Sequence, residues 1–359
     1  MGYTQHKLKS IFQSRYMERL TEREKEILAL LQSEPMISQE ELASRLNISR
    51  SSAAVHISNL MRKKAILGRG YVFNERTQVV LVGEIYNLVE VQVEDQDLFS
   101  HPPARGRITS RWGGSGLVIA ERLAAMKVPV LLITAAGMEE GCEPVLASLR
   151  RAGVDTRHVF RSDEYSFPRV LRVLKDKKTA VEIHDLEALN LVSDLLAGKD
   201  SLFGGAKAVC LSSSLPPDAI CYCLEMSREQ DFTLFLSAGV DIRSLKVIPN
   251  YEGTDFLILD ARQLSEITGI RVEGEEGIQK GAMVLQVKGV ANVIVLAQEG
   301  VFLFAHDDTR LPLLPGQESI PRTMIYNLTA GLIYGVVKGY SFRQSARIGL
   351  GALAGTKGR

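Results

Sequence analysis

From Val79 onward, the chain alternates short apolar runs with longer helix-like stretches. The apolar runs include VVLVG, VPVLLIT, AVCLSSS, FTLFLSA, TDFLILD and NVIVLA. Strands buried on both faces of a parallel sheet are apolar along their whole length, and each needs a crossover, usually a helix, before the next. The alternation therefore predicts βα units around a mainly parallel sheet.

The N-terminal part has a different pattern and a different charge. Up to about Lys64 the apolar residues recur at helical spacing. Residues 1–77 carry 13 Lys and Arg against 8 Asp and Glu, a net charge of +5, whereas the remaining residues carry 30 against 34, a net charge of −4. The whole-chain net charge of +1 hides this difference. We place the boundary near Glu75–Gln78, which gives an N-terminal extension (1–19), a small domain (20–76) and a large domain (77–359).

Composition limits the compartment and the partners. The 359-residue chain is 45% hydrophobic, and no apolar run approaches the roughly 20 residues that span a bilayer. The start lacks the apolar core of a secretory signal. Four scattered cysteines are too few for a disulfide framework, and Cys221 and Cys223 have no second pair to complete a zinc site. We expect a cytoplasmic protein with no membrane partner, no metal and no cofactor.

Three helix starts can be read in the small domain. Thr21 with Glu24, and Ser38 with Glu41, have the spacing of capping boxes, and Ser49 can cap a third helix. Two short helices joined by a tight turn, the second with a small polar outward face, are typical of a helix-turn-helix. The following residues, 65–73, read as two short strands around Gly68-Arg69-Gly70, which predicts a wing with a cation at its tip.

The helix after Ser49 has two faces by helical spacing. We expect the inward face to hold Ala53, Ile57, Leu60, Met61 and Lys64. We expect the outward face to hold Ser51, Ser52, Val55, His56, Asn59, Arg62 and Lys63.

Residues 20–75 resemble the winged helix-turn-helix of leucine-responsive and related bacterial regulators. The resemblance implies that the helix after Ser49 enters the major groove of double-stranded DNA. It makes Arg50, Ser51, Ser52, His56 and Asn59 candidates for base-edge contacts. Arg62, Lys63, Lys64 and Arg69 become candidates for phosphate contacts. The alternative is a winged-helix protein-interaction module whose basic residues are simply solvated.

From Val79 to its end, the chain resembles the ribokinase-like (PfkB) carbohydrate and nucleoside kinase family. The resemblance lies in VVLVG, in WGGSG with the following IAERLA, in VLLITAAG, in LRRAGVDT and in TAGLIYG. It implies an α/β three-layer sandwich behind an all-α winged helix-turn-helix. It also implies that a lid of strands, about Val89–Arg111, pairs two subunits into a homodimer.

The family signature is altered at its catalytic end. Thr323, Met324, Ile325 and Tyr326 stand where the family has G-A-G-D. The glycines of that motif open an anion hole at a helix start, and its Asp acts as general base. A tyrosine has a reference pKa of about 10 and is a poor base near neutrality, so base and anion hole look lost together.

Other family positions differ as well. Tyr86 and Leu88 replace residues that hold sugar hydroxyls, and Val118 replaces an Asn that touches substrate. The family's N-x-x-E motif falls at Asp260–Gln263, where Asp260 could still bind a cation weakly. The glycine that ends the nucleotide-side strand is Ala297, and Arg359 comes earlier than the family's usual end.

These departures lead us to expect a pseudokinase, with no catalytic residues and no phosphotransfer. The old cleft is either disused or still binds a small sugar- or nucleoside-like effector. Its candidate residues are Tyr86, Trp112, Gly113, Gly114, Asp260 and Tyr326. The main hypothesis is a DNA-binding transcriptional regulator, and the alternatives are an ATP-dependent sugar or nucleoside kinase and a protein-interaction module. The pair His184-Asp185 is interpreted as a solvated turn.

Overall fold

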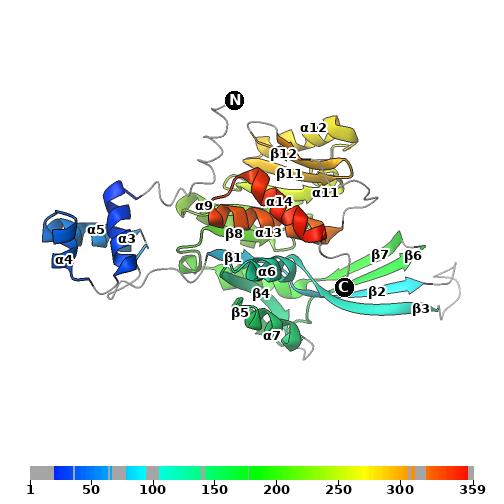
Figure 1. The fold of residues 1–359 in the computed structure, drawn as a ribbon. Helices are drawn as coiled ribbons and strands as arrows, with labels where there is room; N and C mark the ends of the chain where they lie inside the picture. Colours follow the sequence, from blue (N-terminus) through cyan, green and yellow to red (C-terminus); the bar gives the residue numbers. More distant parts are fainter. Residues whose placement is uncertain are drawn as a thin grey trace.

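The computed structural model describes most of the chain (Figure 1). The described residues are 20–34, 37–63, 65–66, 78–93, 105–138, 142–176, 178–305, 309–311 and 321–354. The wing, with Arg69, and the inward-face candidate Lys64 lie outside these residues.

The N-terminal domain is a three-helix unit with its own core. Its helices are α3 (Glu22–Ser33), α4 (Gln39–Arg45) and α5 (Arg50–Arg62). Ile27, Leu31, Leu42 and Leu60 are fully buried in a cluster formed only by residues 20–66. This domain therefore buries its apolar surface without help from the sheet that follows.

Side-chain caps fix where these helices begin. The backbone N–H of Glu24 donates to Thr21 Oγ1 (3.2 Å) and that of Thr21 to Glu24 Oε2 (2.7 Å), so the first capping box is confirmed. Ser38 and Ser49 each accept one backbone N–H at the start of their helices. Each such cap contributes about 1 kcal/mol to stability.

The C-terminal domain is built on a nine-stranded sheet, as the alternation of apolar runs predicts. The strand order is β13-β12-β11-β10-β9-β8-β1-β4-β5, and every pair is parallel except those that β12 forms with β11 and β13. The strands are β1 (Val79–Val82), β4 (Val130–Gly137), β5 (Asp155–Ser162), β8 (Ala208–Ser212), β9 (Thr233–Ser237), β10 (Phe256–Asp260), β11 (Asn292–Ala297), β12 (Gly300–Phe304) and β13 (Thr309–Leu311).

Helices cover both faces of this sheet, which is the predicted three-layer sandwich. Val79 and Leu81 belong to one buried cluster and Val80 and Val82 to the other, because successive side chains of a strand point to opposite faces. One face packs against α6 (Ser115–Ala125), α7 (Glu143–Arg151), α13 (Arg322–Lys338) and α14 (Phe342–Ala354).

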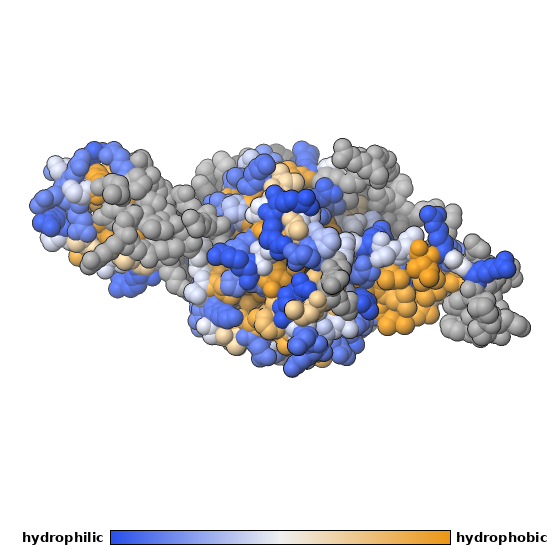
Figure 2. Space-filling view, turned by 90° about the horizontal axis from the view of Figure 1, so that it is seen from below, coloured by the Kyte–Doolittle hydropathy of each residue, from blue (hydrophilic) through white to orange (hydrophobic). Residues whose placement is uncertain are grey.

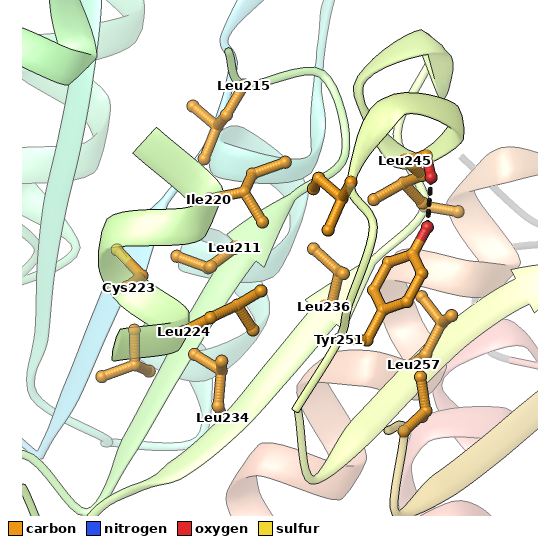
Figure 3. Close-up of a cluster of buried hydrophobic side chains, with 14 of the residues drawn as sticks. Leu211, Leu215, Ile220, Cys223, Leu224, Leu234, Leu236, Leu245, Tyr251 and Leu257 are labelled. Carbon is orange, nitrogen blue, oxygen red and sulfur yellow. Dashed lines mark hydrogen bonds between the residues drawn. The ribbon is translucent and has the colours of Figure 1, made fainter. Parts of the chain in front are cut away.

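The opposite face packs against α8 (Leu191–Leu196), α9 (Pro217–Glu229), α10 (Arg243–Val247), α11 (Ala261–Thr268) and α12 (Gly274–Val287), with short 3-10 turns at Glu187–Asn190 and Asp200–Leu202. Figure 3 shows part of this layer, where leucines of β8 and β9 meet α9 and Tyr251. The buried Tyr251 hydroxyl donates to the Leu245 carbonyl. This bond satisfies the one polar atom that the ring brings into the core.

A second, four-stranded sheet leaves the main sheet directly after β1 (Figure 1). Its strands are β2 (Tyr86–Val93), β3 (Gly106–Gly113), β6 (Arg169–Lys175) and β7 (Lys178–Asp185), in the order β3-β2-β6-β7. We call it the lid. It includes the described part of the stretch 89–111 that the resemblance marks as a pairing element.

Two sequence-based expectations are corrected by the structure. Met61 was placed on the inward face of α5 but is 42% exposed, because that face closes over Ala53, Ile57 and Leu60 alone. His184 lies on β7, its side chain is only 19% exposed and it contacts Glu182, so the interpretation as a solvated turn is wrong.

Among the helices of the described residues, none is long and apolar enough to cross a membrane.

Candidate active site and nucleic-acid interface

A buried carboxylate lies at the carboxyl ends of the central strands. Glu84 follows β1 and is fully buried. The backbone N–H and hydroxyl of Ser115, at the start of α6, donate to its two oxygens at 3.1 and 2.9 Å, and the Ser212 hydroxyl at the end of β8 bonds to it as well. Burial raises the pKa of Glu84, and the hydrogen bonds from Ser212 and Ser115 offset only part of that rise.

Gly113 and Gly114, between β3 of the lid and α6, lie so close to neighbouring atoms that a larger side chain would clash. A Cβ on Gly114 would meet the Glu84 carbonyl oxygen at 2.2 Å, and Gly114 has a φ of +114°, which favours glycine. A Cβ on Gly113 would meet Cε2 of the Tyr86 ring at 2.8 Å. The structure therefore brings three predicted cleft residues, Tyr86, Gly113 and Gly114, together with Glu84, and places the Tyr86 ring directly on Gly113.

Tyr326, at the family's base position, lies on α13 and is 1% exposed. Burial and the charge of Glu84 raise its pKa well above the usual value, while the nearby Arg322 charge opposes that rise. Near neutrality Tyr326 therefore keeps its proton, so its hydroxyl can donate a hydrogen bond. Its hydroxyl has no hydrogen-bond partner among the residues that the structure describes.

Charged residues join the lid to the start of α13. Arg322, the first residue of that helix, donates from Nη1 to Glu182 Oε1 on β7 at 2.9 Å. Arg172 on β6 donates from Nε to Glu182 Oε2 at 2.7 Å, and His184 Nε2 lies 2.8 Å from Glu182 Oε1. Burial opposes ionisation of Glu182, but these three partners together hold its pKa far below the usual range. A partly buried cluster of charged side chains therefore ties the lid to the start of α13.

The other two predicted cleft residues have structural roles in this fold. Trp112 packs edge-on against Phe167, with ring centroids 5.2 Å apart. Asp260 caps α11: it accepts the Gln263 N–H at 2.7 Å, and Gln263 Oε1 accepts the Asp260 N–H at 3.0 Å. Glutamine at the position of the motif's glutamate thus completes a capping box, and Asp260 is committed to that cap.

The DNA-binding candidates that the structure describes lie along α5. Arg50 and Ser51 are exposed at its first turn, and Ser52, His56 and Asn59 are half-buried. Arg50 is loosely tied to Glu40 on α4, with 3.2 Å between Nη1 and Oε1. An exposed pair of this kind is worth little and leaves Arg50 available to a ligand.

The last turn of α5 is tied to its own domain. Arg62 donates to Asn59 Oδ1 at 2.6 Å. Lys63 Nζ lies 2.7 Å from Oε2 of Glu24, a carboxylate that is only 2% exposed. Burial alone would raise the pKa of Glu24, but its bonds to Lys63 and Thr21 bring the pKa below the usual value. Lys63 therefore neutralises a buried charge, whereas the sequence suggested only a phosphate contact.

Sequence reasoning missed the charged residues Glu84, Arg172, Glu182 and Arg322. Glu84 carried a usable signal, because a carboxylate directly after an apolar strand marks the edge where parallel sheets bind ligands. The other three carried none, since the lid and α13 meet only through the fold.

Comparison with known proteins gives two family matches. Residues 20–66 match a model described as winged helix-turn-helix DNA-binding, and residues 76–320 match the pfkB family carbohydrate kinase model. A curated relative from Escherichia coli (strain K12), named "Uncharacterized sugar kinase YeiI", is 30% identical over 344 residues, covering 93% of each chain. The C-terminal domain alone cannot supply that share, so the likeness extends into the winged helix.

Solved ribokinases share the fold of the C-terminal domain. The structure of Arabidopsis thaliana ribokinase complexed with ribose and ATP has a TM-score of 0.61 and 19% identity, covering 77% of this chain and 91% of that one. Ribokinase from Giardia lamblia gives a TM-score of 0.64 and 14% identity, over 77% and 91% of the two chains. These likenesses confirm the ribokinase-like fold.

The expectation that this chain is not an enzyme is contradicted by these matches, since the pfkB model and the relative covering 93% of the chain both carry the name of sugar kinases. That expectation rests on five departures from the family pattern: the base, the anion-hole glycines, and the positions for substrate hydroxyls, metal and nucleotide. Catalysis of phosphoryl transfer depends chiefly on positioning the two reactants and on stabilising the charge of the transition state. Proton transfer to a side chain contributes less. A lost carboxylate at position 326 is therefore weak evidence against activity.

Proposed function

This chain belongs to the pfkB family of carbohydrate kinases, and we propose that its C-terminal domain phosphorylates a hydroxyl of a carbohydrate or nucleoside with ATP. The observation that carries the proposal is the 30% identity to a protein named as a sugar kinase, over 93% of both chains. The ligand would bind between the lid and the strand ends near Glu84, where ligands of open α/β sheets bind.

The reaction forms a bond between the substrate hydroxyl oxygen and the γ-phosphorus and breaks the bond from that phosphorus to the β–γ bridging oxygen. The products are a phosphorylated substrate, ADP and the hydroxyl proton. The chain's contribution is to hold the two reactants in line and to exclude water beneath the lid. Glu84 and Ser115 form a fixed, buried hydrogen-bonded pair behind the strand ends. Tyr326, at the position of the family's base, stays protonated and can donate a hydrogen bond but cannot take the substrate proton, which is released to solvent.

A second function is favoured by the winged helix-turn-helix DNA-binding domain. The chain is proposed to act as a transcriptional regulator that binds an operator through α5 in the cytoplasm, where DNA and ATP are both present. A ligand of the kinase domain that binds two dimer arrangements unequally would shift operator affinity. The exposed N-terminal turn of α5, with Arg50 and Ser51, supports this proposal.

The kinase proposal is tested with the purified full chain, MgATP and a panel of sugars and nucleosides. The expected result is substrate-dependent ADP formation and a product heavier by one phosphoryl group. Gly113→Leu should abolish turnover, because its side chain would displace the Tyr86 ring that lies against Gly113. Gly351→Leu is the matched control, since nothing lies within 4 Å of a Cβ at that position.

Two outcomes count against the proposal. One is ADP formation that no member of the panel stimulates. The other is a rate in the folded Gly113→Leu variant equal to that of Gly351→Leu, which would assign the activity to a contaminating enzyme.

A further inference from the structure

The outward side of α5 carries one apolar side chain among polar ones. Four exposed residues follow one another at spacings of four, three and four, and so form a ridge along one side of the helix: Ser51, Val55, Ser58 and Arg62. We call it the outer ridge. It lies opposite the buried face formed by Ala53, Ile57 and Leu60, so it is the side of α5 that faces away from the domain core.

Val55 contributes little to the folding of its own domain. It is 59% exposed, so little of its apolar surface leaves water when the domain folds. A β-branched residue is also a weaker helix former than alanine or the long polar residues that suit an exposed helix face. Val55 therefore adds neither core packing nor helix stability, and its methyl groups remain available to a ligand.

The neighbours of Val55 allow a ligand to approach closely. Ser51 and Ser58, one turn to either side, are no longer than Val55, so its methyl groups can touch a surface that lies along the outer ridge. Arg62 ends the ridge and Arg50 directly precedes it, and α5 contains no acidic residue. A polyanion along the ridge would therefore meet two positive charges with an apolar group between them.

Double-stranded DNA offers a matching apolar group at one of its bases. In the major groove, thymine presents a C5-methyl group beside the donors and acceptors of the base edges, and apolar side chains contact it. Such a contact removes the methyl groups of both partners from water. We propose that Val55 recognises a thymine of the operator by contact with this methyl group. The proposal rests on the proposed DNA binding by α5 and adds a specificity-determining residue to it.

The test uses a duplex that the full chain has selected from a random pool, with each thymine replaced in turn by uracil. Uracil pairs as thymine does and lacks only the methyl group. For the wild type, at least one replacement should weaken binding about fourfold, the equivalent of one buried methyl group. In Val55→Ser that loss should disappear, while the effects of the other replacements stay as they are. Fluorescence anisotropy at fixed salt measures both affinities.

Two further variants serve as controls. Serine and valine have similar helix propensities, so Val55→Ser should fold as the wild type does, which thermal unfolding followed by circular dichroism checks. Val55→Thr keeps one methyl group and should retain part of the preference for thymine. Met61→Ser is the matched control: Met61 is 42% exposed on the same helix but lies off the outer ridge, so the preference should not change.

Two results would overturn the role of Val55 and leave DNA binding by α5 standing. One is a wild-type chain whose binding no uracil replacement weakens. The other is the same loss at every thymine position in the wild type and in folded Val55→Ser. If the wild-type chain selects no duplex from the pool, the proposed DNA binding fails and the role of Val55 fails with it.

Discussion

Glu84 is an ionisable residue in a place that disfavours its charge. It is fully buried, and burial raises its pKa further than the hydrogen bonds from Ser212 and Ser115 can lower it. A carboxyl whose pKa is higher in the folded state than in the unfolded chain binds more protons when folded. Stability is therefore lost as the pH rises from about the unfolded value through the folded one.

Glu84→Gln removes this pH-dependent loss while keeping a side chain that can bond both serines. Relative to the wild type, the variant should gain free energy of unfolding as the pH rises from 5 to 8, at about 1.4 kcal/mol for each unit of the pKa rise. Urea unfolding at several pH values measures the difference, with the exposed Glu229→Gln as control. Parallel pH dependences for wild type and Glu84→Gln would show that Glu84 ionises without cost.

At the scale of elements, α5 joins a folding role to an interface role. Ala53, Ile57 and Leu60 hold it in the core, Ser49 fixes its start and Lys63 ties its end to Glu24. This leaves Arg50 and Ser51 presented at the first turn, the part of a recognition helix that contacts base edges in helix-turn-helix proteins.

Arg50→Ala should weaken binding to a duplex that the wild-type chain has selected from a random pool. A loss of about 1–3 kcal/mol, roughly five- to 150-fold in affinity, is expected for an arginine that contacts a base. Fluorescence anisotropy at fixed salt measures the change. Arg23→Ala removes an equal charge from α3, outside the proposed recognition helix, and should have a smaller effect. Equal losses for the two variants would reject α5 as the reading element.

The elements show how far sequence reasoning reaches. Capping at Thr21 and the apolar run 79–82 are local signals, and both elements were predicted correctly. The D-A-R-Q segment was read as a damaged cation motif, whereas the structure uses Asp260 and Gln263 as a helix cap. The Glu182–Arg322 pair joins residues 140 apart in the chain, and no local pattern encodes such a contact.

At the scale of the whole molecule, the lid has one charged and one apolar face. Strand register places Val91 beside Ile108 and Val173, and Leu171 beside Ile183, all on the face opposite Glu90, Arg172 and Glu182. Ile108 and Ile183 are 69% and 54% exposed. Figure 2 shows a continuous hydrophobic region over this sheet. A second copy that presents the same face would cover it by two-fold symmetry, which supports the proposed homodimer.

If the lid forms the proposed homodimer interface, the double variant Ile108→Asp with Ile183→Asp should leave the chain as a monomer. Burying two carboxylates in an apolar interface costs several kcal/mol, enough to dissociate a complex of moderate affinity. Light scattering coupled to size exclusion gives the mass. Val287→Asp on α12 is the control, because that side chain is 88% exposed and lies away from the lid. A dimeric double variant would place the interface elsewhere.

The order of strands in the main sheet also determines when each strand can pair during synthesis. β1 pairs with β4 on one side and with β8 on the other, and β8 begins only at Ala208. During synthesis, β1 has only one of its two neighbours until β8 has left the ribosome. The N-terminal helices complete their core from residues 20–66 alone. Local contacts form faster than distant ones, so the DNA-binding domain should mature on the nascent chain well before the kinase domain closes.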